Sequence, residues 1–315
     1  MLTRSLYPNL LRMSRNKKAV TRRKRSPSRR PSGRARNTSR FFKAFSSSAV
    51  LAFSVASWFL HPDWQTTVSP TSLLSEWAAF HQAPTAALVP PSGDIAQTNF
   101  AQCRQFFPGQ QPPAVPARPA LRELCFDSFA ILHDGGTKTP VFAVQRLTRT
   151  MLDQARAIER TDRFYAEARL PKHERAELTD YRSSGFSRGH MAPAGDMHTP
   201  EAMAQSFSLA NMVPQDQTQN AGAWSRIEQD TRKYVMRTRG PVYIFTGPVY
   251  GPEPRRVGAG GVAVPDYLFK LVHDAGTGRS WVHWQANHAD AVAGRPISYD
   301  QFVEWTGLHL LPSSG

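Results

Sequence analysis

The sequence is poor in the residues that build zinc sites. It has only two cysteines, Cys103 and Cys125, and no second histidine spaced to share a metal with His190. Asp196 and His198 lie nearby in sequence, but a histidine used as a ligand is no longer a base, so we do not expect zinc. The two cysteines fit one disulfide if the chain is exported, and two free or buried thiols are the alternative.

Acidic residues are absent before Asp63. Residues 1–43 hold 15 of the 39 Lys and Arg residues, which leaves 24 basic against 24 acidic residues in the rest of the chain. The formal net charge of +15 therefore belongs to the tail. Because the rest is formally neutral, the charge is poor evidence that a folded domain binds nucleic acid. Phosphate binding there would need locally placed arginines.

Long apolar runs are also scarce, and the clearest is residues 41–60. Residues 1–40 are rich in Arg and Ser, and we expect a disordered basic tail because they lack apolar side chains to bury. Basic residues before an apolar run predict a membrane signal-anchor or a signal peptide. The protein would then be exported, anchored facing the periplasm or outside, or secreted after cleavage. A mitochondrial transit peptide and an apolar patch in a disordered tail are the alternatives.

Residues 61–122 are rich in Pro and Ala, which predicts a linker. Residues 123–315 mix strand and helix patterns without regular βαβ alternation, which predicts an α+β domain. Asn220 is expected to cap a helix that stops at Gly240, and Ser298 to cap a last helix that ends at Gly307. The expected strands are 126–132, 141–147, 206–213, 242–245, 267–273 and 281–286, and a further helix is expected at 171–178.

The most informative motif is Ser187-Arg188-Gly189-His190, with Asn220 and Glu228 further along the chain. Histidine accepts a proton near neutral pH. Arginine can donate two N–H groups to one phosphate. An amide or carboxylate oxygen suits Mg²⁺. These are the groups that phosphodiester hydrolysis needs.

This pattern resembles the DNA/RNA non-specific endonucleases of the ββα-metal (His-Me finger) type, the group that includes the Serratia nuclease and endonuclease G. The resemblance runs from about Leu124 to Pro312. Besides the stretch from Asn220 to Glu228, the further motifs, in family order, are Glu123–Phe126, Leu209–Gln215, Thr246–Tyr250 and Val264–Tyr267. The resemblance implies a central antiparallel sheet flanked by helices, and Mg²⁺-dependent, sugar-non-specific hydrolysis of DNA and RNA. Mn²⁺ is an alternative cofactor, and a homodimer stays open.

The resemblance also assigns roles to the motif residues. His190 is the expected general base that deprotonates water. Asn220 is the expected metal ligand, with helix capping alone as the alternative, because one side-chain oxygen cannot serve both roles. Glu228 is expected to order metal-bound waters, or else to be a solvent-exposed helix carboxylate. Arg188 is expected to bind the scissile phosphate.

Three further residues carry alternatives. Arg160 matches the place of a second phosphate-binding arginine, although Arg163 is an alternative. Asn211 matches a family asparagine beside the active site, and a strand-end hydrogen bond is the equal alternative. Ser187 departs from the Asp that much of the family carries, which leaves the preference for endo- or exonuclease cleavage open. The alternative function is a catalytically weak nucleic-acid-binding protein anchored at a membrane.

Overall fold

The structure is a computed structural model that describes residues 93–312. The predictions for the basic tail, for the apolar run and for residues 61–92 lie outside this range. Within it, no helix is both long enough and apolar enough to cross a bilayer.

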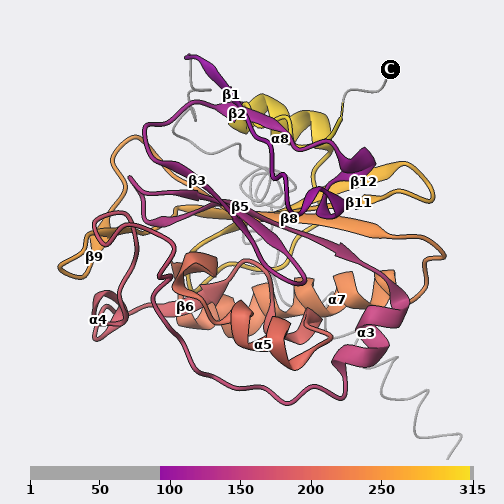
Figure 1. Cartoon of the computed structure of the whole chain (residues 1–315), viewed down its shortest axis with the longest axis horizontal. Helices are drawn as coiled ribbons and strands as arrows, with labels where there is room; N and C mark the ends of the chain where they lie inside the picture. Colours follow the sequence, from indigo (N-terminus) through magenta and orange to yellow (C-terminus); the bar gives the residue numbers. More distant parts are fainter. Residues whose placement is uncertain (1–92, 313–315) are drawn as a thin grey trace, which may run out of the picture. The chain divides into compact units, whose positions relative to one another are not determined.

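Six antiparallel strands form the central sheet (Figure 1), in the order β12-β11-β8-β5-β4-β3. Their bounds are Leu121–Cys125 for β3, Ala130–Asp134 for β4, Thr139–Leu147 for β5, Val242–Val249 for β8, Tyr267–Asp274 for β11 and Arg279–Ala286 for β12. The expected α+β class with a central antiparallel sheet is confirmed. The strand expected at 126–132 starts only at Ala130, because residues 126–129 turn between β3 and β4.

Both faces of this sheet are covered, as Figure 1 shows. One face carries α3 (Arg149–Ala155), α5 (Pro200–Ser206) and α7 (Ser225–Val235). The other carries α8 (Tyr299–Thr306) and the two-stranded ribbon of β1 (Ile95–Gln97) and β2 (Ala114–Pro116). The central strands are therefore buried on both sides, which explains their almost continuous apolar sequences.

Because side chains alternate along a strand, adjacent cross-strand rows face opposite ways. One row, which we call the apolar row, faces α8 and consists of Val144, Phe245, Leu271 and Val282. The next row faces α7, and we call it the polar row: Ala143, Thr246, Lys270 and His283. The sheet thus separates an apolar layer from a layer that contains polar and charged groups.

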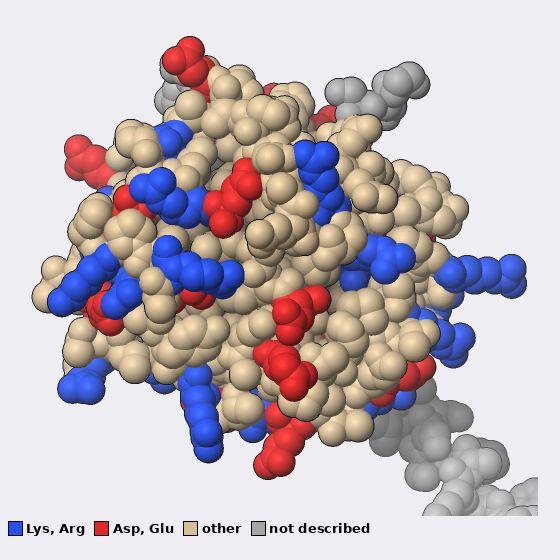
Figure 2. All heavy atoms as spheres, in the orientation of Figure 1, with Lys and Arg blue, Asp and Glu red and all other residues tan. Residues whose placement is uncertain are grey.

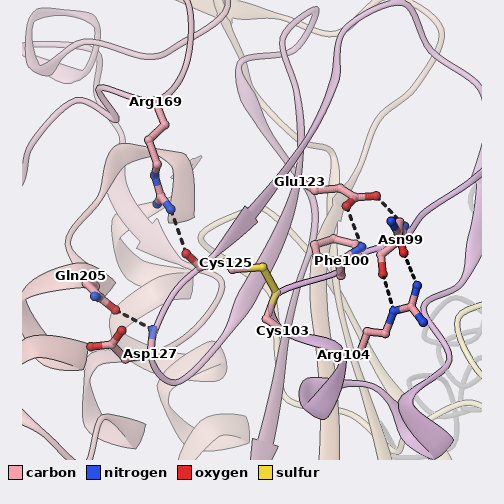
Figure 3. The surroundings of a disulfide bond; sticks show 9 residues. All are labelled: Asn99, Phe100, Cys103, Arg104, Glu123, Cys125, Asp127, Arg169 and Gln205. Atoms are coloured by element: carbon pink, nitrogen blue, oxygen red, sulfur yellow. Dashed lines mark hydrogen bonds between the residues drawn. A yellow bond between two sulfur atoms is a disulfide. The ribbon is translucent and has the colours of Figure 1, made fainter.

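The segment before β3 is not a linker, so that prediction is wrong for residues 95–122. Phe100 and Phe107 are buried and pack against Phe142 of β5. The Glu123 carboxylate accepts hydrogen bonds from the backbone N–H groups of Asn99 and Phe100, at 2.6 and 2.7 Å (Figure 3). Aromatic side chains within the proline-rich stretch supply the apolar area that docks it on the sheet.

The expected disulfide is present between Cys103 and Cys125, with the two Cα atoms 5.8 Å apart (Figure 3). It joins the docked segment to the last residue of β3. On the far side of the bond, the Arg169 guanidinium donates to the Cys125 carbonyl at 2.8 Å. The disulfide therefore joins the docked segment to β3, and the Arg169 hydrogen bond connects the end of β3 to the loop that follows α3.

The last helix begins and ends as the sequence indicates. The Ser298 hydroxyl accepts a hydrogen bond from the Gln301 N–H at 3.1 Å, which caps the first turn of α8. Gly307 ends the helix in the left-handed region, with φ of 65°. The helix expected at 171–178 is instead a series of turns, and the short α4 (Leu178–Tyr181) follows it. Residues 206–211 complete α5 and a 3₁₀ turn, so the expected strand begins only at Met212.

Candidate active site

The motif residues lie on a ββα unit. β6 (Ser187–His190) pairs antiparallel with β7 (Met212–Gln215), and one helical segment follows, made of α6 (Gln217–Gln219), the π-helical turn η6 (Asn220–Trp224) and α7. Gly189 is required between Arg188 and His190, because a Cβ atom there would overlap the Gln215 side chain. The spacing of the motif thus has a steric cause in the hairpin.

His190 lies at the end of β6 between two aromatic rings, 5.8 Å from Phe164 and 5.1 Å from Phe207. Its Nε2 atom is buried and has no hydrogen-bond partner in the described part of the chain. Burial first, and then the positive charges of Arg160 and Arg188, lower the pKa of His190 to about 3, against the opposing effect of Asp162. The imidazole is therefore neutral at pH 7, and in the protein without substrate it is a weak base.

Two arginines approach His190 by stacking on these same rings. The Arg188 guanidinium lies 3.9 Å from the centroid of Phe164, and that of Arg160 lies 5.0 Å from the centroid of Phe207. The Arg160 Nε atom also donates to Asp162 at 2.6 Å. Arg163 is exposed and makes no such contact among residues 93–312. Of the two candidates for the second phosphate-binding arginine, the structure brings Arg160 to the site.

The expected helix cap at Asn220 is wrong. Asp216 is the cap, since its carboxylate accepts from the N–H groups of Thr218 and Gln219 at 2.9 and 3.0 Å. Asn220 lies one turn inside the helical segment, with helical φ and ψ of −60° and −49°. Aspartate is as good a cap as asparagine, and Asp216, the residue after β7, satisfies the first N–H groups before the chain reaches Asn220.

The Asn220 amide is held by the motif serine. Its Nδ2 group donates to the Ser187 hydroxyl at 3.0 Å, and that hydroxyl donates to the Gln215 carbonyl at 3.0 Å. The amide oxygen accepts no hydrogen bond from any residue that the structure describes. The competition between capping and metal binding is therefore absent, and the oxygen is free for another ligand.

Glu228 is partly buried on α7, unlike the solvent-exposed carboxylate that was the alternative. Burial raises its pKa to about 7, against the lowering effect of Lys270, and Asp196 adds a further raising effect. Asp196 itself pairs with Arg232 at 2.9 Å. Glu228 and Asn220 lie on the same helical segment, so the helix fixes their separation.

Lys270 is a residue that sequence analysis did not single out. It lies in the polar row, is only 1% exposed, and donates from Nζ to the Thr246 hydroxyl at 2.8 Å. Its ammonium also lies 5.3 Å from the centroid of Trp224 in η6. Burial lowers the pKa of Lys270, and the charge of Glu228 opposes that change. A lysine in the middle of an otherwise apolar strand is the signal that could have identified it.

Asn211 fits the hydrogen-bonding alternative. Its buried amide donates to the carbonyls of Ala192 and Ser206 at 2.8 and 2.9 Å and accepts from the Ala192 N–H at 2.9 Å. These bonds hold the backbone that follows His190. His198, considered above for zinc, lies 3.2 Å from the Ser128 hydroxyl.

The comparisons with known proteins concern the family and the fold. The family described as "DNA/RNA non-specific endonuclease" matches residues 114–306. Nuclease EXOG, mitochondrial, from Xenopus laevis is 35% identical over 184 residues, which are 54% of this chain and 50% of that protein. The Homo sapiens protein of the same name is 32% identical over 159 residues, 47% and 43% of the two chains. This chain spans about half the length of the curated relatives it matches.

A solved structure shares the fold. The chain matches one described as "Crystal structure of the EndoG/EndoGI complex: Mechanism of EndoG inhibition" with a TM-score of 0.56 and 23% identity, covering 68% of this chain and 91% of that chain. The chain therefore has the ββα-metal fold, with a central antiparallel sheet flanked by helices. The chain belongs to the DNA/RNA non-specific endonuclease family.

Proposed function

We propose that this protein is a divalent-metal-dependent hydrolase that cleaves phosphodiester bonds of DNA and RNA without sequence specificity. The observation that supports this proposal most is the Asn220 amide. Ser187 orients it so that its oxygen is free, and it lies on the helical segment that follows β7, the partner strand of the one that carries His190. The family and the relatives named as nucleases support the same reaction.

In this proposal, His190 is the general base. The neutral imidazole takes a proton from the attacking water, and the hydroxide forms a bond to phosphorus as the bond to the leaving oxygen breaks. Arg188 and Arg160 hold the phosphate and neutralise the charge that develops on its oxygens. An anionic phosphate between these arginines and His190 would offset their charge and thereby favour the protonated imidazole. The base would become stronger where its substrate is bound.

The donor set fits a hard divalent cation such as Mg²⁺. Among residues 93–312 there is no group of three or more His, Cys, Asp or Glu side chains placed to hold a metal. One amide oxygen leaves the remaining positions to waters and phosphate oxygens, which is how Mg²⁺ is commonly bound. Such a cation would stabilise the charge of the leaving oxygen. Glu228 would order its waters from further along the helix.

Loose specificity follows from the side chains that meet the substrate. Arginines contact phosphates, and phosphates carry no sequence information. The two EXOG relatives are named as mitochondrial, which supports the mitochondrial alternative over export for this chain. The disulfide between Cys103 and Cys125 supports a compartment that is not reducing.

The test is degradation of plasmid DNA and of RNA by the full chain, with Mg²⁺, with Mn²⁺ and with EDTA. We expect cleavage of both polymers with metal and none with EDTA. Cleavage that persists in EDTA would contradict a metal-dependent mechanism.

A pair of variants tests the metal ligand itself. Asn220→Ala should abolish cleavage, whereas Asn220→Asp should retain it with an altered Mg²⁺ titration, because a carboxylate also binds Mg²⁺. Gln229→Ala, an exposed amide on α7, is the matched control. Unchanged Mg²⁺ titrations for both Asn220 variants would refute the assignment.

A further inference from the structure

A hollow of about 500 Å³ opens beside Arg188, one of the two arginines proposed to bind phosphate. Its wall is aromatic and aliphatic, made by Phe164, Leu178, Tyr181 and Phe186, and its polar edge includes Arg182 and Arg188. The volume is within the range of about 300–1,000 Å³ that small-molecule sites occupy. None of the reaction steps above uses this hollow.

The wall formed by α4 is rigidly held. The Asp180 carboxylate accepts from the N–H groups of Gly260 and Glu177, at 2.7 and 2.9 Å. Gly258 and Gly260 both lie so close to Asp180 that a Cβ atom at either position would overlap it. The loop after β9 (Arg256–Val257) therefore packs closely against α4 and bonds to it. Because these contacts hold α4 in place without a ligand, the hollow is preformed.

One feature of the wall is unusual for a surface with no ligand. Leu178 leaves 41% of its surface exposed, and few large apolar side chains in the described range are this open. The Tyr181 hydroxyl is buried and has no hydrogen-bond partner among residues 93–312. An exposed leucine in the wall of a hollow indicates a ligand with an apolar face, whereas the Tyr181 hydroxyl is out of contact with solvent and gives no information about the ligand.

The charges around the hollow indicate that this ligand is part of a polyanion. The Arg255 guanidinium lies 4.6 Å from the centroid of Phe186, and Arg182 is exposed. Figure 2 shows Lys and Arg side chains gathered on the side of the molecule that carries α4 and β9, with some acidic side chains among them. Aromatic rings bordered by arginines are the combination that binds single-stranded nucleic acid.

We propose that this hollow binds the base and sugar of the nucleotide attached to the phosphate that Arg188 holds. The inference rests on the proposed function and deepens it. Arg188 lines the hollow and also stacks beside His190, so it joins the two parts of the site. A base that enters this hollow must leave its stack, so an unpaired nucleotide fits directly and a duplex fits where a base has unpaired.

The test is binding of two ligands to the full chain in EDTA, measured by calorimetry. The first ligand is thymidine 3′,5′-bisphosphate, and the second is its abasic tetrahydrofuran analogue, which keeps both phosphates. Because stacking of one base contributes about 1–3 kcal/mol, the wild type should prefer the first ligand by about 5- to 150-fold. Leu178→Ala and Phe186→Ala should each reduce this preference and leave the affinity for the abasic ligand unchanged.

Ile95→Ala is the control, because Ile95 is an exposed aliphatic residue on β1. It should keep the full preference. Equal affinity of the wild type for the two ligands, or an undiminished preference in both hollow variants, would overturn the nucleoside site and leave the proposed function intact. If neither ligand binds the wild type, the phosphate site is overturned as well.

Discussion

The apolar row and the polar row cross the same strands one residue apart, yet they have different roles. The apolar row faces α8 and packs in a cluster rich in phenylalanine, which includes Phe142, Phe269 and Phe302. The polar row places Thr246 and Lys270 under the helix that carries Asn220 and Glu228. The α8 face of the sheet therefore supplies apolar packing. The α7 face contains the buried charge of Lys270 next to the helical segment that carries the candidate site.

The two faces also differ in how their polar groups are satisfied. On the α8 face, the Glu123 carboxylate bonds two backbone N–H groups of the docked segment. On the α7 face, Gln145 and Trp224 have buried side-chain atoms without partners in the described range. Unsatisfied buried groups cost about 1–3 kcal/mol each, so natural proteins concentrate them at functional sites.

The largest expected effect concerns the chemistry. His190→Ala should lower the cleavage rate by about 10²–10⁴-fold, because it removes the proposed general base. The folded fraction, measured by circular dichroism, should not change. His198→Ala is the matched control, since that histidine contacts Ser128, and it should remain active. Near-full activity of His190→Ala would place the base elsewhere.

Next in size is a loss of packing on the apolar row. Phe245→Ala should lower the free energy of unfolding by about 3–5 kcal/mol, because a fully buried ring is replaced by a cavity. Urea unfolding measures this loss, with Val292→Ala, an exposed side chain, as the control. The kcat per folded molecule should stay at the wild-type value. A large fall in kcat would mean that packing on the α8 face also controls the geometry of the site on the α7 face.

The disulfide should contribute less than the aromatic core does. Replacement of Cys103 and Cys125 by serine should lower the free energy of unfolding by about 3 kcal/mol, since the bond closes a loop of modest length. The sequence separation of the two cysteines is 22 residues. Cleavage at 25 °C should be retained. If the double variant shows no loss of stability, the aromatic packing of Phe100 and Phe107 and the hydrogen bonds to Glu123 hold the docked segment without help from the disulfide.

The smallest effect is a pH dependence on the polar row. The pKa of Glu228 rises from 4.5 to about 7 on folding, so the folded state holds a proton that the unfolded state has released between these values. The contribution of Glu228 to stability in EDTA should therefore be full below pH 4.5 and should fall by about 1–3 kcal/mol as the pH rises to 7, whereas the lowered pKa of His190 contributes a rise over part of this range. The difference in thermal unfolding between the wild type and Glu228→Gln, measured across this range, tests the sign.

Two variants sharpen that measurement. Glu228→Gln should flatten the fall, because the amide does not titrate. Lys270→Met should extend the fall to higher pH, because it removes the buried positive charge that favours the carboxylate. An identical pH slope in Glu228→Gln and the wild type would show that another group is responsible.

Much of the site could be predicted because its residues are close in the chain. The spacing of Arg188 and His190 reflects a single strand, and Asn220 and Glu228 lie on one helical segment. Local capping chemistry likewise placed α8 correctly. The same local logic failed at Asn220, because Asp216 also caps well and stands first in the chain.

Other features depend on contacts that a linear pattern does not contain. The docking of residues 95–122 arises from aromatic side chains that meet β5 and β8 across the sheet. From composition alone, that stretch is predicted to be a proline-rich, extended linker. The position of Lys270 in the polar row depends on strand register, which pairs it with Thr246 and brings its ammonium close to the Trp224 ring.

The sequence by itself determined the family, the α+β class, the order of the motifs and the residue types of the site. These are local or compositional properties, and elementary chemistry links them to phosphodiester hydrolysis. Only the tertiary structure decided which arginine stacks beside His190, that the Asn220 oxygen is free, and that a hollow lies next to Arg188. Each of these depends on distances between elements far apart in the chain, and packing of the whole domain fixes such distances.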